Sequence, residues 1–182
     1  LLLLVILALW YRANVQPRVA DAGESLAISY FSSTQPMSLK EVAAIAPERW
    51  QALPEQRASF GYTNKQYWFR FTLNSAFYDR VLHIGYPLLD QLNLYWQQAD
   101  SLTTFSLGDK QPYYERPILT SEFSIPIPAG ESGTMIISAQ TESSMRLPIS
   151  IRSEQEFFDA QMQKRLAEGI YFGVLLCMAV YN

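Results

Sequence analysis

The feature that most limits the fold of this chain is the alternation of apolar and polar residues in short runs between residues 25 and 151. In YWFRFTL, residues 67–73, every second residue is large and apolar, and MRLPISI, residues 145–151, repeats the pattern. A period of two is typical of strands that bury one face. Because turn-forming residues separate the runs, we predict a mainly β domain, a sandwich or jelly roll.

Further strands are expected wherever the alternation returns. They cover residues 25–31, 81–84, 91–97, 103–107, 123–128 and 134–140. In FSIPIP, residues 123–128, two prolines share the face opposite Phe123, Ile125 and Ile127. Proline cannot donate a hydrogen bond to a neighbouring strand, so this run is predicted to lie at a sheet edge.

One short helix is expected early in the chain, near residues 39–45. Ser38 and Glu41 have the spacing of a capping box, and Met37 and Val42 occupy the two positions of a hydrophobic staple. A proline soon afterwards ends the helix. We expect this helix to cover one end of a sheet.

The first 22 residues differ from the rest. Residues 1–11, LLLLVILALWY, form an apolar run as long as the core of a signal peptide, and an Ala-Asp-Ala cleavage pattern ends at Ala22. We predict an export signal or, because only Arg12 interrupts the run, an uncleaved anchor. A buried N-terminal helix is the alternative.

The last 30 residues change to a helical period. Phe158, Met162 and Leu166 form a stripe, and residues 169–182 then continue as an apolar run without charge. A membrane span needs about 20 apolar residues. We therefore predict a connector helix over 153–168 and the opening of a truncated first membrane helix over 169–182. A helix packed on the sandwich is the alternative.

Composition excludes several functions. The chain has 14 basic and 17 acidic residues and no basic run, which argues against a nucleic-acid partner. Cys177 is the only cysteine and His83 the only histidine, so neither a CxxC site nor a multi-histidine metal site can form. No catalytic motif is present, and His83 is expected to be structural. We predict no enzyme, metal site or cofactor in these residues.

The residues present suit the recognition of a sugar better than they suit catalysis. Aromatic faces stack on sugar rings, while charged or amide groups hold hydroxyls. The candidate ligand-binding residues are Tyr62, Trp68, Arg70, Tyr86, Asp90, Asp109, Arg116 and Arg146. If their strands are neighbours, Arg70 and Arg146 share a face and can bind a carboxylate or phosphate. Turn formation by the two aspartates, or arginine–aspartate salt bridges between loops, is the structural alternative.

Five segments of the chain resemble a known family in their order and spacing. They are YWFRFTL, IGYPLLDQLNLY, LGDKQPYYERP, SSMRLPISI and GIYFGVLLCMAVYN. Together they resemble the type 2 extracellular domain of 7TMR-DISM proteins, bacterial seven-transmembrane receptors with diverse intracellular signalling modules. The resemblance covers residues 26–151. It implies a jelly roll similar to carbohydrate-binding modules, seven membrane helices, and a cytoplasmic histidine kinase or diguanylate cyclase.

The resemblance also implies a location and a role. We expect residues 23–152 to form a sensor domain of a protein that lies in the inner membrane, with residues 23–168 in the periplasm. The domain would bind a small molecule or glycan and signal through the membrane helices, and analogy with other receptors suggests a homodimer. Two alternatives stay open. One is a protein-interaction module that regulates a partner receptor without a small ligand, and the other is a carbohydrate-active enzyme.

Overall fold

The computed structural model describes residues 26–53, 57–74, 77, 79–127 and 132–181. The predicted signal peptide or anchor, residues 1–22, lies outside the described residues. The chain forms two compact units, one spanning residues 24–151 and a second that contains the C-terminal helix. Each unit is described by itself.

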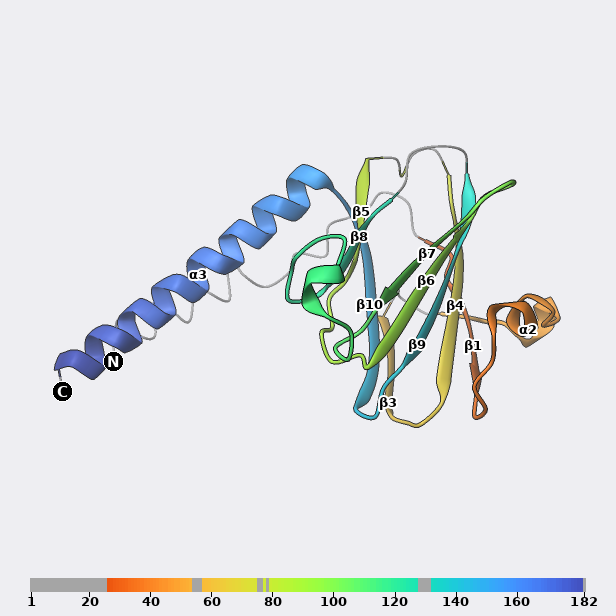
Figure 1. Ribbon diagram of the computed structural model, residues 1–182, viewed down its shortest axis with the longest axis horizontal. Coiled ribbons are helices and arrows are strands. Elements are labelled where there is room, and N and C mark those ends of the chain that lie inside the picture. Colours follow the sequence, from red (N-terminus) through yellow and green to blue (C-terminus); the bar gives the residue numbers. More distant parts are fainter. Residues whose placement is uncertain (1–25, 54–56, 75–76, 78, 128–131, 182) are drawn as a thin grey trace. The chain divides into compact units, whose positions relative to one another are not determined.

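The first unit contains two β-sheets (Figure 1). The six-stranded sheet has the order β2-β1-β4-β9-β6-β7, and the four-stranded sheet has the order β3-β10-β5-β8. Strands of the first sheet are β1 (Ser29–Ser33), β2 (Gln51–Ala52), β4 (Gln66–Leu73), β6 (Gln91–Gln97), β7 (Leu102–Leu107) and β9 (Gly133–Gln140). Strands of the second sheet are β3 (Arg57–Tyr62), β5 (Arg80–Ile84), β8 (Phe123–Pro126) and β10 (Ser144–Ser153). The mainly β sandwich predicted from the alternation is confirmed.

The inner core lies between the two sheets and is built by the alternating residues. In β4, Phe69, Phe71 and Leu73 are at most 2% exposed, and Leu92 and Leu94 of β6 are fully buried. Opposite them, the four-stranded sheet contributes Leu82, Ile84, Phe123, Ile125, Met145, Leu147, Ile149 and Ile151. Burial of apolar area on this scale is the main driving force for the fold.

A second apolar layer, here named the outer cluster, covers the other face of the six-stranded sheet. Its buried members are Phe31, Val42, Trp68 and Ile136. Helix α2 (Leu39–Ala43) supplies Val42, and Figure 1 shows α2 beside β1. The helix thus packs on the outer face of the sheet, whereas the sequence analysis expected it to cover one end of a sheet. As a result, β4 is buried on both faces over residues 67–69, whereas Thr72 on the outer face stays exposed.

The predicted capping box of α2 is confirmed. The Glu41 carboxylate accepts a hydrogen bond of 2.7 Å from the backbone N–H of Ser38, and the Ser38 hydroxyl accepts one of 3.4 Å from the backbone N–H of Glu41. The two hydrogen bonds satisfy donors that the first turn of a helix leaves free. Short 3-10 helices η1 (Pro47–Arg49) and η4 (Tyr113–Glu115) lie in loops.

The edge position predicted for the proline-containing strand is confirmed. β8 ends at Pro126 and lies at one edge of the four-stranded sheet, with Phe123 and Ile125 buried. Pro128 lies outside the described residues. The sequence analysis did not predict β2 or β3. In β3, Ala58, Phe60 and Tyr62 do alternate with the residues between them, but alanine and glycine are depleted in strands and give a weak signal.

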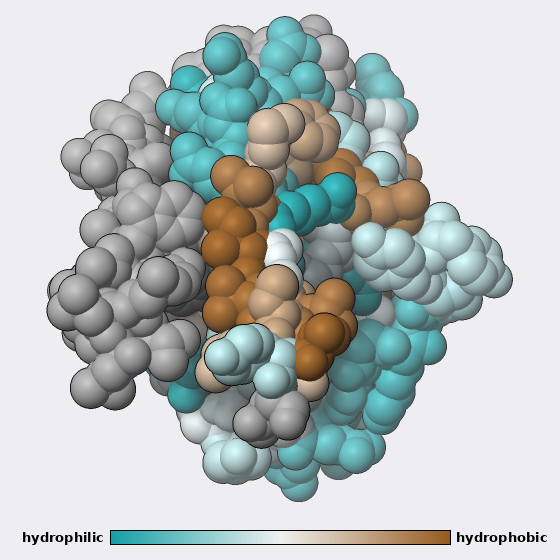
Figure 2. Space-filling view, turned by 90° about the vertical axis from the view of Figure 1, so that its left-hand side faces the viewer, coloured by the Kyte–Doolittle hydropathy of each residue, from teal (hydrophilic) through white to brown (hydrophobic). Residues whose placement is uncertain are grey.

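Helix α3 (Glu154–Tyr181) is a single helix of 28 residues that follows β10 directly. Ser153 and Glu156 form a second capping box, with a hydrogen bond of 3.1 Å from the Ser153 N–H to the Glu156 carboxylate. Figure 2 faces the C-terminal end of α3, and brown apolar side chains gather on this face. Within the described residues, no helix combines the length and the apolar stretch needed to cross a membrane.

Candidate functional site

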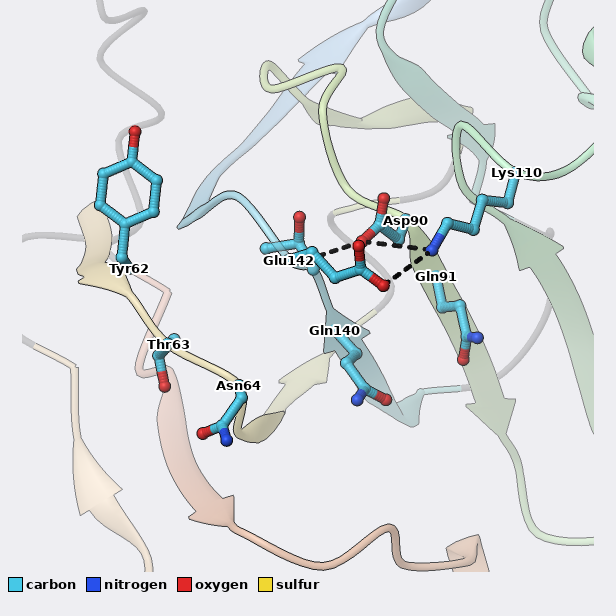
Figure 3. A pocket seen from close by; sticks show the side chains of 9 residues that line it. Tyr62, Thr63, Asn64, Asp90, Gln91, Lys110, Gln140 and Glu142 are labelled. Atoms are coloured by element: carbon cyan, nitrogen blue, oxygen red, sulfur yellow. Dashed lines mark hydrogen bonds and ion pairs between the residues drawn. The ribbon is translucent and has the colours of Figure 1, made fainter.

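A pocket of about 500 Å³ opens where several loops meet at one end of the sandwich (Figure 3). The loop after β3, the start of β6, the residues after β7 and the turn between β9 and β10 all contribute to it. It is lined by Tyr62, Thr63, Asn64, Asp90, Gln91, Lys110, Gln140, Thr141 and Glu142. Its volume falls within the range of small-molecule sites.

Asp90 organises the charged side of this pocket. Its carboxylate accepts a hydrogen bond of 2.7 Å from the backbone N–H of Glu142, and the Lys110 ammonium lies 3.7 Å from the same oxygen. Lys110 also donates to the Glu142 carboxylate at 3.4 Å. The hydrogen bond to Glu142 and the charge of Asp90 raise the pKa of Lys110 above its ordinary value. Lys110 is half exposed, so water weakens both ion pairs.

The turn between β9 and β10 is also tied to the loop before β6. The Thr141 hydroxyl donates a hydrogen bond of 2.9 Å to the Leu88 carbonyl, and the Ser143 hydroxyl donates to the same oxygen at 3.1 Å. Thr141 is buried, and Ser143 is partly buried. These hydrogen bonds hold the two turns that form the floor of the pocket.

Gly108 allows a third loop to approach the same place. Its φ is +139°, and a Cβ built there would lie 2.3 Å from the Asp90 carbonyl oxygen. The neighbouring Asp109 N–H donates a hydrogen bond of 2.8 Å to the Leu89 carbonyl. Only glycine fits this backbone conformation and this contact. The loop that contains Lys110 is therefore fixed by backbone contacts.

The opposite wall is formed by the loop after β3. Tyr62 is 86% exposed, and Figure 3 shows its ring standing apart from the network around Asp90. Thr63 stabilises this loop, because its hydroxyl accepts a hydrogen bond of 3.2 Å from the backbone N–H of Lys65. Tyr62 gives the pocket an aromatic face, Thr63 a hydroxyl, and Asn64 and Gln140 two amides. Such groups suit a polar ligand with several hydroxyls.

A second hollow of about 420 Å³ lies beside β1 and η1. Several polar groups on its lining already have partners, since the Tyr30 hydroxyl donates to Gln51 at 2.6 Å and the Arg49 guanidinium lies over the Phe31 ring. The first pocket has the exposed aromatic ring and the freer amides. We therefore take the first pocket as the candidate site.

Of the eight predicted ligand-binding residues, Tyr62 and Asp90 line this pocket. Asp109 lies beside Lys110 in the sequence but not on the lining. Tyr86 is partly buried and packs against the inner core. Trp68 is 1% exposed in the outer cluster, so its ring has no free face for a sugar. The proposed stacking role of Trp68 is corrected here.

The two arginines expected on a common face lie in different sheets. Arg70 belongs to β4 of the six-stranded sheet, and its guanidinium lies 4.3 Å from the centre of the Trp50 ring. Arg146 belongs to β10 of the four-stranded sheet and is exposed. Since the sheets meet through their inner faces, the outward-pointing arginines lie on opposite sides of the sandwich. They cannot form the shared anion site that the sequence suggested.

Arg116 braces its own loop. Its guanidinium donates to the carbonyls of Thr120 at 2.8 Å and Ser121 at 3.2 Å, and lies 4.7 Å from the centre of the Phe123 ring. The alternative of arginine–aspartate salt bridges is also corrected for Asp90, because its ion-pair partner among the described residues is Lys110.

His83 has partners at both ring nitrogens. Nδ1 lies 2.9 Å from the Ser124 hydroxyl, and Nε2 lies 3.4 Å from the Glu122 carboxylate. The residue is 8% exposed. These contacts are those of a structural histidine within the four-stranded sheet.

Most of the pocket was not predicted from the sequence. The missed lining residues are Thr63, Asn64, Gln91, Lys110, Gln140, Thr141 and Glu142. Their only signal was a position in or next to a turn, and polar turn residues are common in every protein. The sequence gives no indication that these turns meet.

A comparison with protein families identifies the family of this chain. The family model described as 7TMR-DISM extracellular 2 matches residues 25–153, which include both sheets and the pocket. No curated protein matches the chain.

Proposed function

Since the chain belongs to the 7TMR-DISM extracellular 2 family, and is therefore the sensor domain of a membrane receptor, we propose that it binds a small, neutral, polyhydroxylated molecule or glycan at the candidate pocket. The observation that carries the proposal is an exposed Tyr62 ring in the lining of the same pocket as a polar wall fixed by Asp90. A preformed wall lowers the entropy lost on binding.

The charges on the pocket argue against an anionic ligand. Asp90 and Glu142 contribute two negative charges, and Lys110 contributes one positive charge that both carboxylates already engage. An acidic sugar or a phosphate would meet net repulsion here. A neutral sugar can instead use the hydroxyl and amide groups of the lining.

Binding at this place can affect the signalling helix through the chain itself. The turn residues Thr141 and Glu142 line the pocket, and β10 runs from Ser144 to Ser153, where α3 begins without a linker. We propose that a ligand favours one of two arrangements of this turn and strand, which requires different affinities for the two arrangements. The apolar end of α3 then meets the membrane and leads to a cytoplasmic histidine kinase or diguanylate cyclase.

The experiment is a thermal-shift screen of the full chain in detergent micelles, followed by calorimetry. The panel contains neutral mono- and disaccharides, amino sugars, sugar acids and organic acids. We expect stabilisation by neutral sugars and at least tenfold weaker binding by Tyr62→Ala, a loss of about 1.4 kcal/mol. Tyr114→Ala is the matched control, because Tyr114 is 78% exposed and lies outside the pocket lining.

Other outcomes assign other functions. Stabilisation by sugar acids alone contradicts the charge argument, and equal losses for both tyrosine variants contradict the pocket. No stabilisation across the panel favours a protein-interaction module. Turnover of a sugar would show that the domain is an enzyme, which our proposal excludes.

A further inference from the structure

The two sheets present four edge strands among the strands that the structure describes, namely β2, β7, β3 and β8. An edge strand exposes unpaired backbone groups, and natural proteins usually protect such edges from pairing with other chains. Three of the four edges have protection of this kind. β2 has only two residues, and β8 ends in Pro126, which has no N–H to donate.

The third protected edge is β3. Its pairing with β10 shifts register between Met145 and Arg146, and Gly61 near its end has a φ of +69°. A bulge twists a strand locally and interrupts the row of hydrogen-bonding groups. Another strand could therefore not continue a regular ladder along β3.

β7 has none of these protections. Its six residues, LTTFSL, contain no charge and no proline, and they pair with β6 in unbroken register from Leu102 to Leu107. Leu102, Thr103, Thr104 and Ser106 are exposed, with Leu102 at 55%. The edge is thus long, regular and accessible.

We propose that β7 pairs antiparallel with β7 of a second copy, so that the two six-stranded sheets join edge to edge. A two-fold axis at Thr104 places Thr104 opposite its own counterpart, Leu102 opposite Ser106, and Thr103 opposite Phe105. Each pair shares a face of the sheet, as antiparallel pairing requires. Without charged residues in β7, no like charges meet across the axis.

The chemistry of this edge favours a second copy over a foreign strand. A domain that recruits a foreign peptide by strand addition selects it through pockets for alternate side chains or through charges. Neither the candidate pocket nor the hollow beside β1 includes a β7 residue, and the strand itself carries no charge. A symmetric contact needs only self-complementarity, which the Thr104-centred register supplies.

The direct test is disulfide cross-linking of the full chain in detergent micelles. Cys177→Ser removes the one native cysteine, and Thr104→Cys then introduces a single thiol on the proposed axis. Opposed residues of antiparallel strands have Cα atoms about 4.5–5.5 Å apart, which a disulfide can bridge. We expect most of the chain to form a disulfide-linked dimer under mild oxidation. Ser59→Cys, at an exposed position of β3, is the matched control and should cross-link poorly.

A second variant tests the contact without a new covalent bond. Thr104→Lys places two ammonium groups opposite each other, and we expect at least a tenfold weaker dimer in analytical ultracentrifugation, whereas Ser59→Lys changes nothing. Circular dichroism checks that both variants fold. Three results would overturn the proposal. They are equal cross-linking at positions 104 and 59, a dimer whose affinity Thr104→Lys does not change, and a chain that is monomeric at every concentration. None of these readouts depends on a ligand, so the proposed binding function is tested separately.

Discussion

The Asp90 carboxylate accepts a hydrogen bond of 2.7 Å from the backbone N–H of Glu142, which lies 52 residues later in the sequence. This contact joins the start of β6 to the turn between β9 and β10. The same oxygen lies 3.7 Å from the Lys110 ammonium. One carboxylate therefore holds two other loops of the candidate pocket in place.

Replacing Asp90 with alanine should lower the free energy of unfolding by about 1.5–3 kcal/mol, as expected for a lost hydrogen bond to a charged group. Asp90→Asn keeps an acceptor oxygen and loses only the ion pair to a half-exposed lysine, so it should cost less than about 1 kcal/mol. Urea denaturation measures both variants. Equal losses would show that the contact to Glu142 contributes nothing.

Replacing Gly108 with alanine should cost about 2–3 kcal/mol, because the new Cβ would overlap the Asp90 carbonyl at a φ of +139°. Gly61→Ala is the matched control. Gly61 also has a positive φ, +69°, but nothing lies within 4 Å of the Cβ position, so only about 1 kcal/mol should be lost. Chemical denaturation gives the free energy of unfolding of both variants. The difference between the two losses is the cost of the close contact, separated from the cost of backbone strain.

Acidification should weaken the capping box of α2. Hydrogen bonds from the backbone and then the side chain of Ser38 lower the pKa of Glu41 below its ordinary value. A lowered pKa in the folded state contributes stability above the ordinary carboxylate pKa, and this contribution is lost as the pH falls through the lowered value. The stability difference between the native chain and Glu41→Gln should therefore shrink at acidic pH. An NMR titration of Glu41 gives the pKa directly, and an unshifted value would contradict the capping contribution.

Replacing Arg116 with lysine should cost about 1–2 kcal/mol. A lysine keeps the charge but cannot donate to the Thr120 and Ser121 carbonyls while lying flat on the Phe123 ring. Arg146→Ala is the comparison, because Arg146 is exposed and should stay within about 0.5 kcal/mol of the native chain. Binding of a neutral sugar should be unchanged in both variants. Loss of sugar binding in either variant would show that the replaced arginine contributes to the ligand site.

The sequence predicted features that depend on neighbours along the chain. The buried faces of β4, β6 and β10 follow from a period of two, and the α2 capping box follows from the three-residue spacing of Ser38 and Glu41. These are local properties of the backbone. The missed strand β3 shows the limit, since its apolar residues alternate but two of its six positions hold alanine and glycine, which are depleted in strands.

Features that depend on strand order were not predictable. Arg70 and Arg146 both point outward from their strands, but alternation does not reveal that β4 and β10 belong to different sheets. In the same way, Trp68 was expected to be available to a ligand, because the sequence did not show that α2 packs on that face. The pocket combines turns that are far apart in the sequence, so only the folded chain shows their proximity.

The six-stranded sheet carries an apolar layer on each face, and each layer contains a fully buried indole. Trp68 lies in the outer cluster and Trp96 in the inner core, and each is 1% exposed. Variants whose single tryptophan is Trp68 or Trp96 can therefore follow the two layers independently during denaturation. If α2 detaches before the sheets separate, the emission of Trp68 shifts to the red while that of Trp96 keeps its native wavelength.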